Sequence, residues 1–141
     1  MVTLLLYMAQ DQHNNLTGIW QGQFSYLVNR FVPEFFTANL IEGPDFLGGS
    51  IHEIAVNGKF IGTRFYASVA GKREGNAVIF TKTYETAQRS HQVHYSGTVN
   101  EDFTEIEGTW NVRSNWAGRF LMIRDKGQSQ SVQRSSVEPV S

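Results

Sequence analysis

The chain contains no cysteine among its 141 residues, and this single absence removes several classes of protein. Disulfide-stapled folds, thiolate enzymes and zinc sites with sulfur ligands are all excluded. A cysteine-free chain also fits a reducing compartment, so we expect a cytoplasmic protein. The length is that of one ordinary domain, which can build a hydrophobic core of its own.

The chain also lacks an excess of charge of either sign and lacks a long apolar run. Twelve basic residues stand against 13 acidic residues, which gives a formal net charge of −1. Nucleic-acid-binding domains usually carry a strong basic excess, so we expect no nucleic-acid partner. The apolar run within residues 1–8 is far shorter than the about 20 residues that span a bilayer. No basic residue precedes Arg30, as a secretory signal would require. We therefore expect no membrane partner.

Both ends of the chain differ in composition from its middle. Residues 1–15 end in a polar stretch that begins after Met8, and we expect a flexible extension in which Met8 is an alternative start. Residues 125–141 contain five serines, three glutamines and no aromatic residue. Such a segment cannot bury enough apolar area to offset its ordering entropy, so we expect a disordered tail. A single domain over residues 16–124 remains.

Within this domain the large apolar residues repeat with a period of two. The alternation is cleanest over residues 106–112, where Ile106, Gly108 and Trp110 share one face. Alternation rich in β-branched and aromatic residues predicts β-strands. Turn-like clusters of Asn, Gly and charged residues separate the expected strands, which cover residues 16–28, 35–42, 49–56, 60–71, 76–85, 90–99, 103–112 and 116–124.

Eight strands joined by short turns predict an all-β fold, an antiparallel up-and-down β-barrel. Short turns permit only antiparallel neighbours, because a parallel crossover needs a dozen or more residues. Closing the sheet on itself removes its two exposed edges. A two-sheet sandwich is the alternative, but it needs longer connections than these turns provide.

The same alternation assigns the side chains that face the interior. In the first strand Trp20, Phe24 and Tyr26 share one face, and their bulk marks this face as the inner one. The other large side chains expected inside the barrel include Phe65, Tyr95, Trp110 and Phe120.

Two strands carry charged residues close to the expected interior. The third strand is undecided, because the face of Ile51, Glu53 and Ala55 competes with an opposite face of similar character. In the fifth strand the face of Lys82 and Tyr84 is favoured as the inner one. A buried charge must be paired. These residues therefore predict either a structural pairing or a polar group that anchors a ligand.

Four phenylalanines lie at or beside the predicted loops, and we expect them at one end of the barrel. Apolar residues at a barrel mouth either form a ligand portal or contact patch, or they plug the open end. The four residues are Phe31, Phe35, Phe36 and Phe46.

The segment Leu16-Thr17-Gly18-Ile19-Trp20 resembles the Gly-x-Trp opening of the calycins, the superfamily of lipocalins, fatty-acid-binding proteins and avidins. In lipocalins a basic residue at the end of the last strand packs over this tryptophan and closes the barrel base. Arg124 lies at the end of the last predicted strand of this chain. The resemblance therefore implies that Arg124 stacks on Trp20, an interaction that contributes about 0.5–2 kcal/mol. Segments 80–84, 94–98 and 118–124 look most like uncharacterised bacterial barrel proteins, and this likeness implies no activity.

Motifs for other chemistry are missing from the sequence. His91 and His94 are three residues apart on one predicted strand, which places their rings on opposite faces, so we expect no metal site. The chain contains no Gly-x-Ser-x-Gly motif, and Gly71–Gly75 lacks the ending of a phosphate loop. We expect no cofactor, and we assign no catalytic residue.

Three functions remain compatible with the sequence. The first is the binding of a small hydrophobic ligand inside the barrel, which eight-stranded barrels permit. The second is a filled barrel that acts as a protein-interaction or self-assembly module, such as a homo-oligomer, through outward residues that include Leu121 and Ile123. The third, which we rank lowest, is an isomerase- or cyclase-type enzyme using Glu53, Lys82 and Tyr95. The expected ligand-binding residues are Trp20, Phe24, Tyr26, Phe35, Phe36, Glu53, Phe65, Lys82, Tyr84, Tyr95, Trp110 and Phe120.

Overall fold

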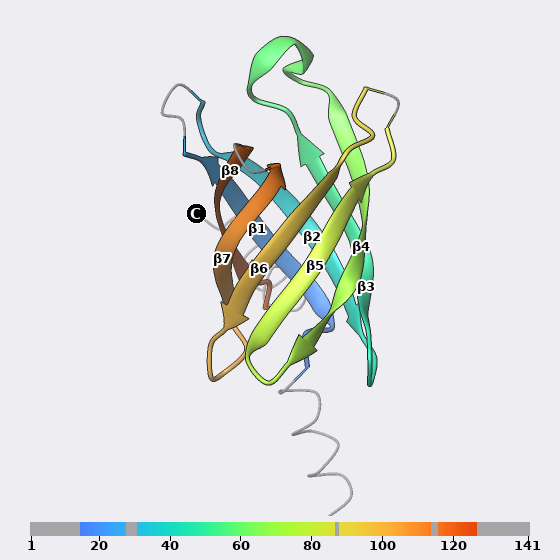
Figure 1. The fold of residues 1–141 in the computed structure, drawn as a ribbon, viewed down its shortest axis with the longest axis vertical. Helices are drawn as coiled ribbons and strands as arrows, with labels where there is room; N and C mark the ends of the chain where they lie inside the picture. The colour runs from blue at the N-terminus through green and yellow to red at the C-terminus, as the bar shows by residue number, and fades with distance from the viewer. Residues whose placement is uncertain (1–14, 28–30, 87, 114–115, 127–141) are drawn as a thin grey trace, which may run out of the picture.

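The computed structural model describes residues 15–27, 31–86, 88–113 and 116–126. The predicted N-terminal extension and C-terminal tail lie almost entirely outside these ranges. The described chain forms eight antiparallel strands that close into a barrel in sequential order (Figure 1). The predicted all-β barrel is thereby confirmed. The elements are β1 (Gly18–Tyr26), β2 (Glu34–Glu42), β3 (Leu47–Ile54), the short 3-10 helix η1 (Gly58–Phe60), β4 (Arg64–Glu74), β5 (Ala77–Tyr84), β6 (Gln92–Val99), β7 (Glu105–Arg113) and β8 (Trp116–Arg124).

The barrel closes where β1 pairs with β8. Trp20 lies opposite Arg124 at one end of this pairing, and Tyr26 lies opposite Gly118 at the other. Asp125, the first residue of the predicted tail, follows directly, and its backbone N–H donates to the carbonyl of Ile19 at 2.8 Å. Because β1 also pairs with β2, every strand has two neighbours and the sheet has no open edge.

Strand β4 differs most from its predicted extent. It begins at Arg64, later than expected, because η1 and Gly62, with a φ of 89°, first turn the chain. It continues to Glu74, which pairs with Ala77 on β5. The turn between β4 and β5 is therefore a tight one of Gly75 and Asn76 rather than the longer cluster expected.

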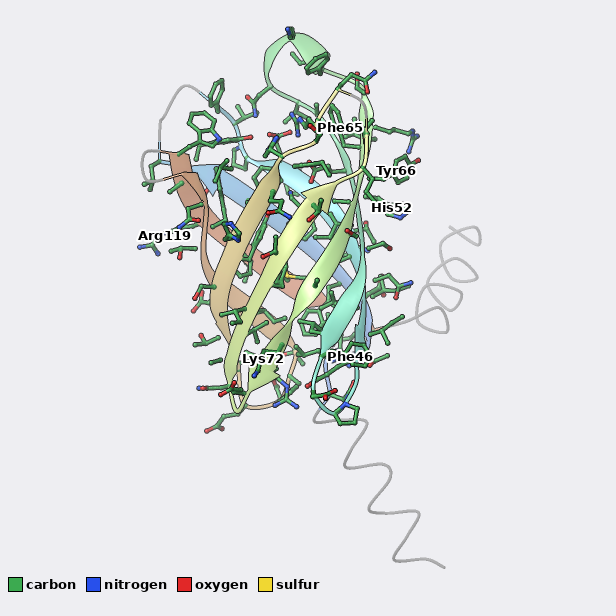
Figure 2. All side chains as sticks on the ribbon, turned by 45° about the vertical axis from the view of Figure 1, so that its right-hand side comes forward. Phe46, His52, Phe65, Tyr66, Lys72 and Arg119 are labelled. Atoms are coloured by element: carbon green, nitrogen blue, oxygen red, sulfur yellow. The ribbon has the colours of Figure 1, made fainter. Side chains whose placement is uncertain are left out.

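The structure decides which faces of β3 and β5 point inward. On β3, Ile51 and Glu53 are buried, whereas His52 and Tyr66 of the neighbouring strand project outward (Figure 2). Glu53 therefore belongs to the barrel interior, a point that the alternation alone had left open. On β5 the favoured face is confirmed, because its inward residues Val78, Phe80, Lys82 and Tyr84 are all buried.

Apolar side chains close the end of the barrel where β1 begins, and this arrangement is referred to below as the Trp20 seal. It is the lower end in Figure 1. Leu16, Trp20 and Met122 are fully buried there. The indole N–H of Trp20 donates to the carbonyl of Leu16 at 2.9 Å. The guanidinium carbon of Arg124 lies 4.7 Å from the Trp20 ring centroid, in the stacked contact that the calycin resemblance implied. Large side chains of the described residues therefore fill the interior at this end.

The prediction that the four loop phenylalanines share one end is wrong. Successive turns of an up-and-down barrel alternate between its two ends. Phe31 belongs to the β1–β2 connection, whereas Phe46 belongs to the next turn, where its carbonyl accepts a hydrogen bond from Gly43 at 2.9 Å. Figure 2 accordingly shows Phe46 at the lower end of the barrel.

Gly49 in β3 provides a test of the strand register. Its φ is 138°, and a Cβ placed on it would lie 2.0 Å from the backbone oxygen of Asn39. We predict that Gly49→Ala lowers the free energy of unfolding by about 2 kcal/mol or more, measured by urea denaturation. Gly48→Ala is the matched control, because the nearest atom to its Cβ would be 3.8 Å away. Equal losses in the two variants would contradict the register.

Candidate ligand pocket and its charged cluster

The interior of the upper half of the barrel contains charged residues from two strands. Lys82 and Tyr84 are two residues apart on β5, so both side chains point inward. Glu53 projects from β3, and β4 lies between these two strands. The alternation of the strands thus forces a carboxylate and an ammonium group into the same interior.

Glu53 accepts hydrogen bonds from three donors. Its Oε2 accepts from Lys82 Nζ at 3.2 Å. Its Oε1 accepts from the Tyr84 hydroxyl and from Arg89 Nη1, the latter at 3.1 Å. Lys82 Nζ also donates to the Tyr84 hydroxyl at 2.8 Å. Glu53, Lys82, Tyr84 and Arg89 are referred to below as the charged cluster.

The cluster is buried to different depths. The side chains of Glu53 and Lys82 are each 1% exposed, whereas that of Arg89 is 18% exposed. Aromatic rings surround both cations: Lys82 Nζ lies 4.7 Å from the centroid of Phe24, and the Arg89 guanidinium lies 4.1 Å from that of Phe65. These ring faces compensate in part for the water that the cations lose.

The phenols and the imidazole near the cluster are neutral at neutral pH. Burial raises the pKa of Tyr84, Tyr95 and Tyr26 above the ordinary value, and for Tyr26 the hydrogen bond to Glu34 raises it further. Burial, followed by the nearby charge of Arg89, lowers the pKa of His91 below its ordinary value of 6.5. These four side chains therefore add no charge at this end of the barrel.

A pocket of about 190 Å³ lies beside the charged cluster, at the upper end of the barrel. Strands β7, β8 and β1 supply an aromatic side, in which the Tyr26 ring centroid lies 5.4 Å from those of both Trp110 and Trp116. Strand β5 and the β5–β6 connection supply the polar side. The lining residues are Phe24, Tyr26, Lys82, Tyr84, Arg89, His91, Val93, Tyr95, Trp110, Val112 and Trp116.

The structure brings about half of the predicted ligand-binding residues to this pocket. Glu53 lies behind the lining, bound to it through the charged cluster. Phe65 supports Arg89, and its position near the upper end is visible in Figure 2. The predicted residues that line the pocket are Phe24, Tyr26, Lys82, Tyr84, Tyr95 and Trp110.

Four other predicted residues lie elsewhere. Trp20 is buried at the sealed end, far along β1 from the pocket. Phe36 and Phe120 are buried in the core and contact lining residues without lining the pocket themselves. Phe35 points out of the barrel with 64% of its surface exposed and lines an outer groove instead, because it has the opposite parity to Phe36 on β2.

Arg89, His91 and Trp116 line the pocket although they are not among the predicted ligand-binding residues. The pattern places Arg89 in a surface turn, and it does lie in one, since its N–H donates to the carbonyl of Thr86 at 3.0 Å. Nothing in the local pattern indicates that its side chain reaches back over Phe65 to Glu53. Trp116 opens the last strand with the same parity as Phe120, and the register that pairs Tyr26 with Gly118 brings its ring against Tyr26.

The described residues show neither a metal-binding group nor a membrane-spanning helix. They hold no group of three or more His, Asp or Glu residues that could bind a metal ion. No helix among the described residues is long and apolar enough to cross a membrane.

Comparisons with known proteins identify the fold and no family. No protein-family model matches the chain, and no curated protein matches it. Among solved structures, the chain is similar to a de novo designed fluorescence-activating beta barrel, with a TM-score of 0.59 and 11% identity. The similarity covers 82% of this chain and 98% of that one. At this identity the likeness concerns the barrel architecture alone.

The charged cluster predicts a large stability cost for removing its carboxylate. Glu53→Gln leaves Lys82 charged in the interior without its counterion, so we expect the free energy of unfolding to fall by about 3–5 kcal/mol. The matched control is Glu74→Gln, which breaks an ion pair to Lys72 whose two side chains are 74% and 52% exposed. We expect the control to unfold at the same urea concentration as the wild type. A Glu53→Gln protein as stable as the control would contradict the pairing.

Proposed function

We propose that this chain binds a small molecule in the pocket beside the charged cluster. One observation carries the proposal: the rings of Tyr26, Trp110 and Trp116 and the cations of Lys82 and Arg89 surround one open volume. Small-molecule sites are mostly apolar concavities with a few polar groups that fix the orientation of the ligand. The pocket has this composition, and it lies at the end of the barrel opposite the Trp20 seal.

The dimensions of the pocket favour a compact ligand. Its volume of about 190 Å³ is below the about 300–1,000 Å³ of sites for drug-sized ligands. Aromatic side chains occupy the middle of the barrel, where the Phe80 and Tyr95 rings stack at 4.6 Å and Phe120 lies 4.9 Å from Tyr95. This packing supports a ligand of one or two rings rather than a long acyl chain threaded through the barrel.

Binding is better supported than an isomerase- or cyclase-type reaction. A cavity enzyme needs a group free to take or give a proton. Both oxygens of Glu53 already accept hydrogen bonds within the charged cluster, and Tyr84 already donates to it. The phenol of Tyr95 is buried and its pKa is raised, which keeps it protonated and makes it a weak acid. The designed barrel that this chain resembles adds support only at the level of the fold.

The proposal is tested with 2-naphthol, a neutral two-ring probe, by isothermal titration calorimetry. We expect the wild type to bind it, and we expect Val112→Phe, which places a ring in the pocket, to weaken binding at least about tenfold. Ile79→Phe is the matched control, because Ile79 lies on the outer face of β5 and is 51% exposed. Thermal unfolding checks that both variants fold. Failure of the wild type to bind, or equal binding by folded Val112→Phe, would refute the proposal.

A further inference from the structure

We infer that the ligand of this pocket carries an anionic group, of the carboxylate class, that binds to the guanidinium of Arg89, an inference that rests on the proposed function. The pocket then takes a small aromatic acid, with its ring against the aromatic side and its acid group against the polar side. Each part of this assignment follows from the side chains that face the open volume.

The charged side chains that line the pocket are both cationic. Lys82 and Arg89 face the open volume, and no carboxylate of the described residues lines it. The two nearest carboxylates lie behind the lining: Glu53 is 4% exposed, and Glu34 is fully buried. The described lining therefore presents cationic side chains and no carboxylate to the open volume.

The neighbouring carboxylates are already engaged. Glu34 accepts hydrogen bonds from the Tyr26 hydroxyl and from the backbone N–H of Val56 at 3.4 Å. Glu53 accepts from three members of the charged cluster. Within the charged cluster two cations face one carboxylate, whereas Glu34 lies outside the cluster, behind Tyr26.

The remaining titratable groups that face the pocket add no negative charge. Tyr26, Tyr84 and Tyr95 are protonated phenols, because burial raises the pKa of each. His91 contacts the Tyr84 ring at 4.9 Å and is neutral near pH 7, because its pKa lies below the ordinary value. An anion would consequently meet no opposing charge on the lining of the pocket.

Arg89 is the member of the charged cluster that can bind the anionic group of the ligand. Its Nη1 donates to Glu53 at 3.1 Å and reaches the Tyr84 hydroxyl at 3.4 Å. Within the described ranges, its Nε and Nη2 contact no acceptor, and its side chain is 18% exposed. The guanidinium plane rests on the Phe65 ring, which holds it in place. A planar guanidinium so held can present two N–H groups to one carboxylate.

Lys82 contributes to the same site without contacting the ligand directly. It is almost fully buried, and its ammonium group is already bound to Glu53 and Tyr84. It therefore adds positive potential at the base of the pocket rather than a direct contact. Aromatic rings on the opposite side, Trp110 and Trp116 among them, leave an apolar surface for the ring of the ligand.

The test compares three probes with the same two-ring skeleton: 2-naphthoate, 2-naphthamide and the cation 2-naphthylmethylammonium. We expect the wild type to bind the anion at least about tenfold more tightly than the amide, with the cation weakest. Equal binding of the anion and the amide, or a preference for the cation, would overturn the inference. In either case the binding of 2-naphthol would still support the proposed function, whereas loss of all binding refutes both.

Variants of Arg89 test whether the preference for the anionic probe depends on this side chain. Arg89→Met keeps an unbranched side chain over Phe65 and removes the charge, so we expect it to abolish the preference for 2-naphthoate over 2-naphthamide. Arg64→Met is the matched control on the outer surface, where Arg64 is exposed, and should keep the wild-type preference. Arg89→Lys, which retains charge without the planar fork, should bind the anion with intermediate affinity. An undiminished preference in Arg89→Met, or in Arg89→Lys if Arg89→Met does not fold, would overturn the inference.

Discussion

Strand β1 is hydrogen-bonded to β2 along one edge and to β8 along the other, and this double pairing closes the sheet. Closure divides every strand into an inner and an outer face, because successive side chains point to opposite sides. Lys82 lies on the inner face of β5 and Glu53 on that of β3, so both charges are buried. A buried charge without a partner is costly, and the charged cluster is the arrangement that satisfies this constraint.

The two ends of the interior differ in chemistry. At one end Trp20, Leu16 and the stacked Arg124 form an apolar seal. At the other end the aromatic rings stop short of filling the barrel, and the pocket beside the charged cluster lies between them. The middle of the barrel is filled by rings such as Phe80 and Tyr95. The molecule thus resembles neither a completely filled barrel nor a hollow one, which is why we propose a compact ligand.

Alternation in the sequence was sufficient to predict the fold and the inward position of Lys82, because Val78 and Phe80 share its parity. It left Glu53 undecided, because both faces of β3 mix apolar and polar residues, and only pairing with β2 and β4 selects one. Arg89 was missed because a side chain that folds back from a turn has no periodic signature. The expectation for Phe46 is wrong because successive turns lie at opposite ends of the barrel, so the turn after β2 lies away from the β1–β2 connection that contains Phe31.

The three tryptophans allow the most direct test of which end of the barrel binds a ligand. Trp110 and Trp116 line the pocket, whereas Trp20 lies in the seal at the other end. In a proton–nitrogen correlation spectrum with assigned indole signals, titration with 2-naphthoate should shift the signals of Trp110 and Trp116 and leave that of Trp20 in place. The Trp20 N–H stays bound to the carbonyl of Leu16. A saturable shift at Trp20, with the other two signals unmoved, would contradict a barrel sealed at one end and open to a ligand at the other.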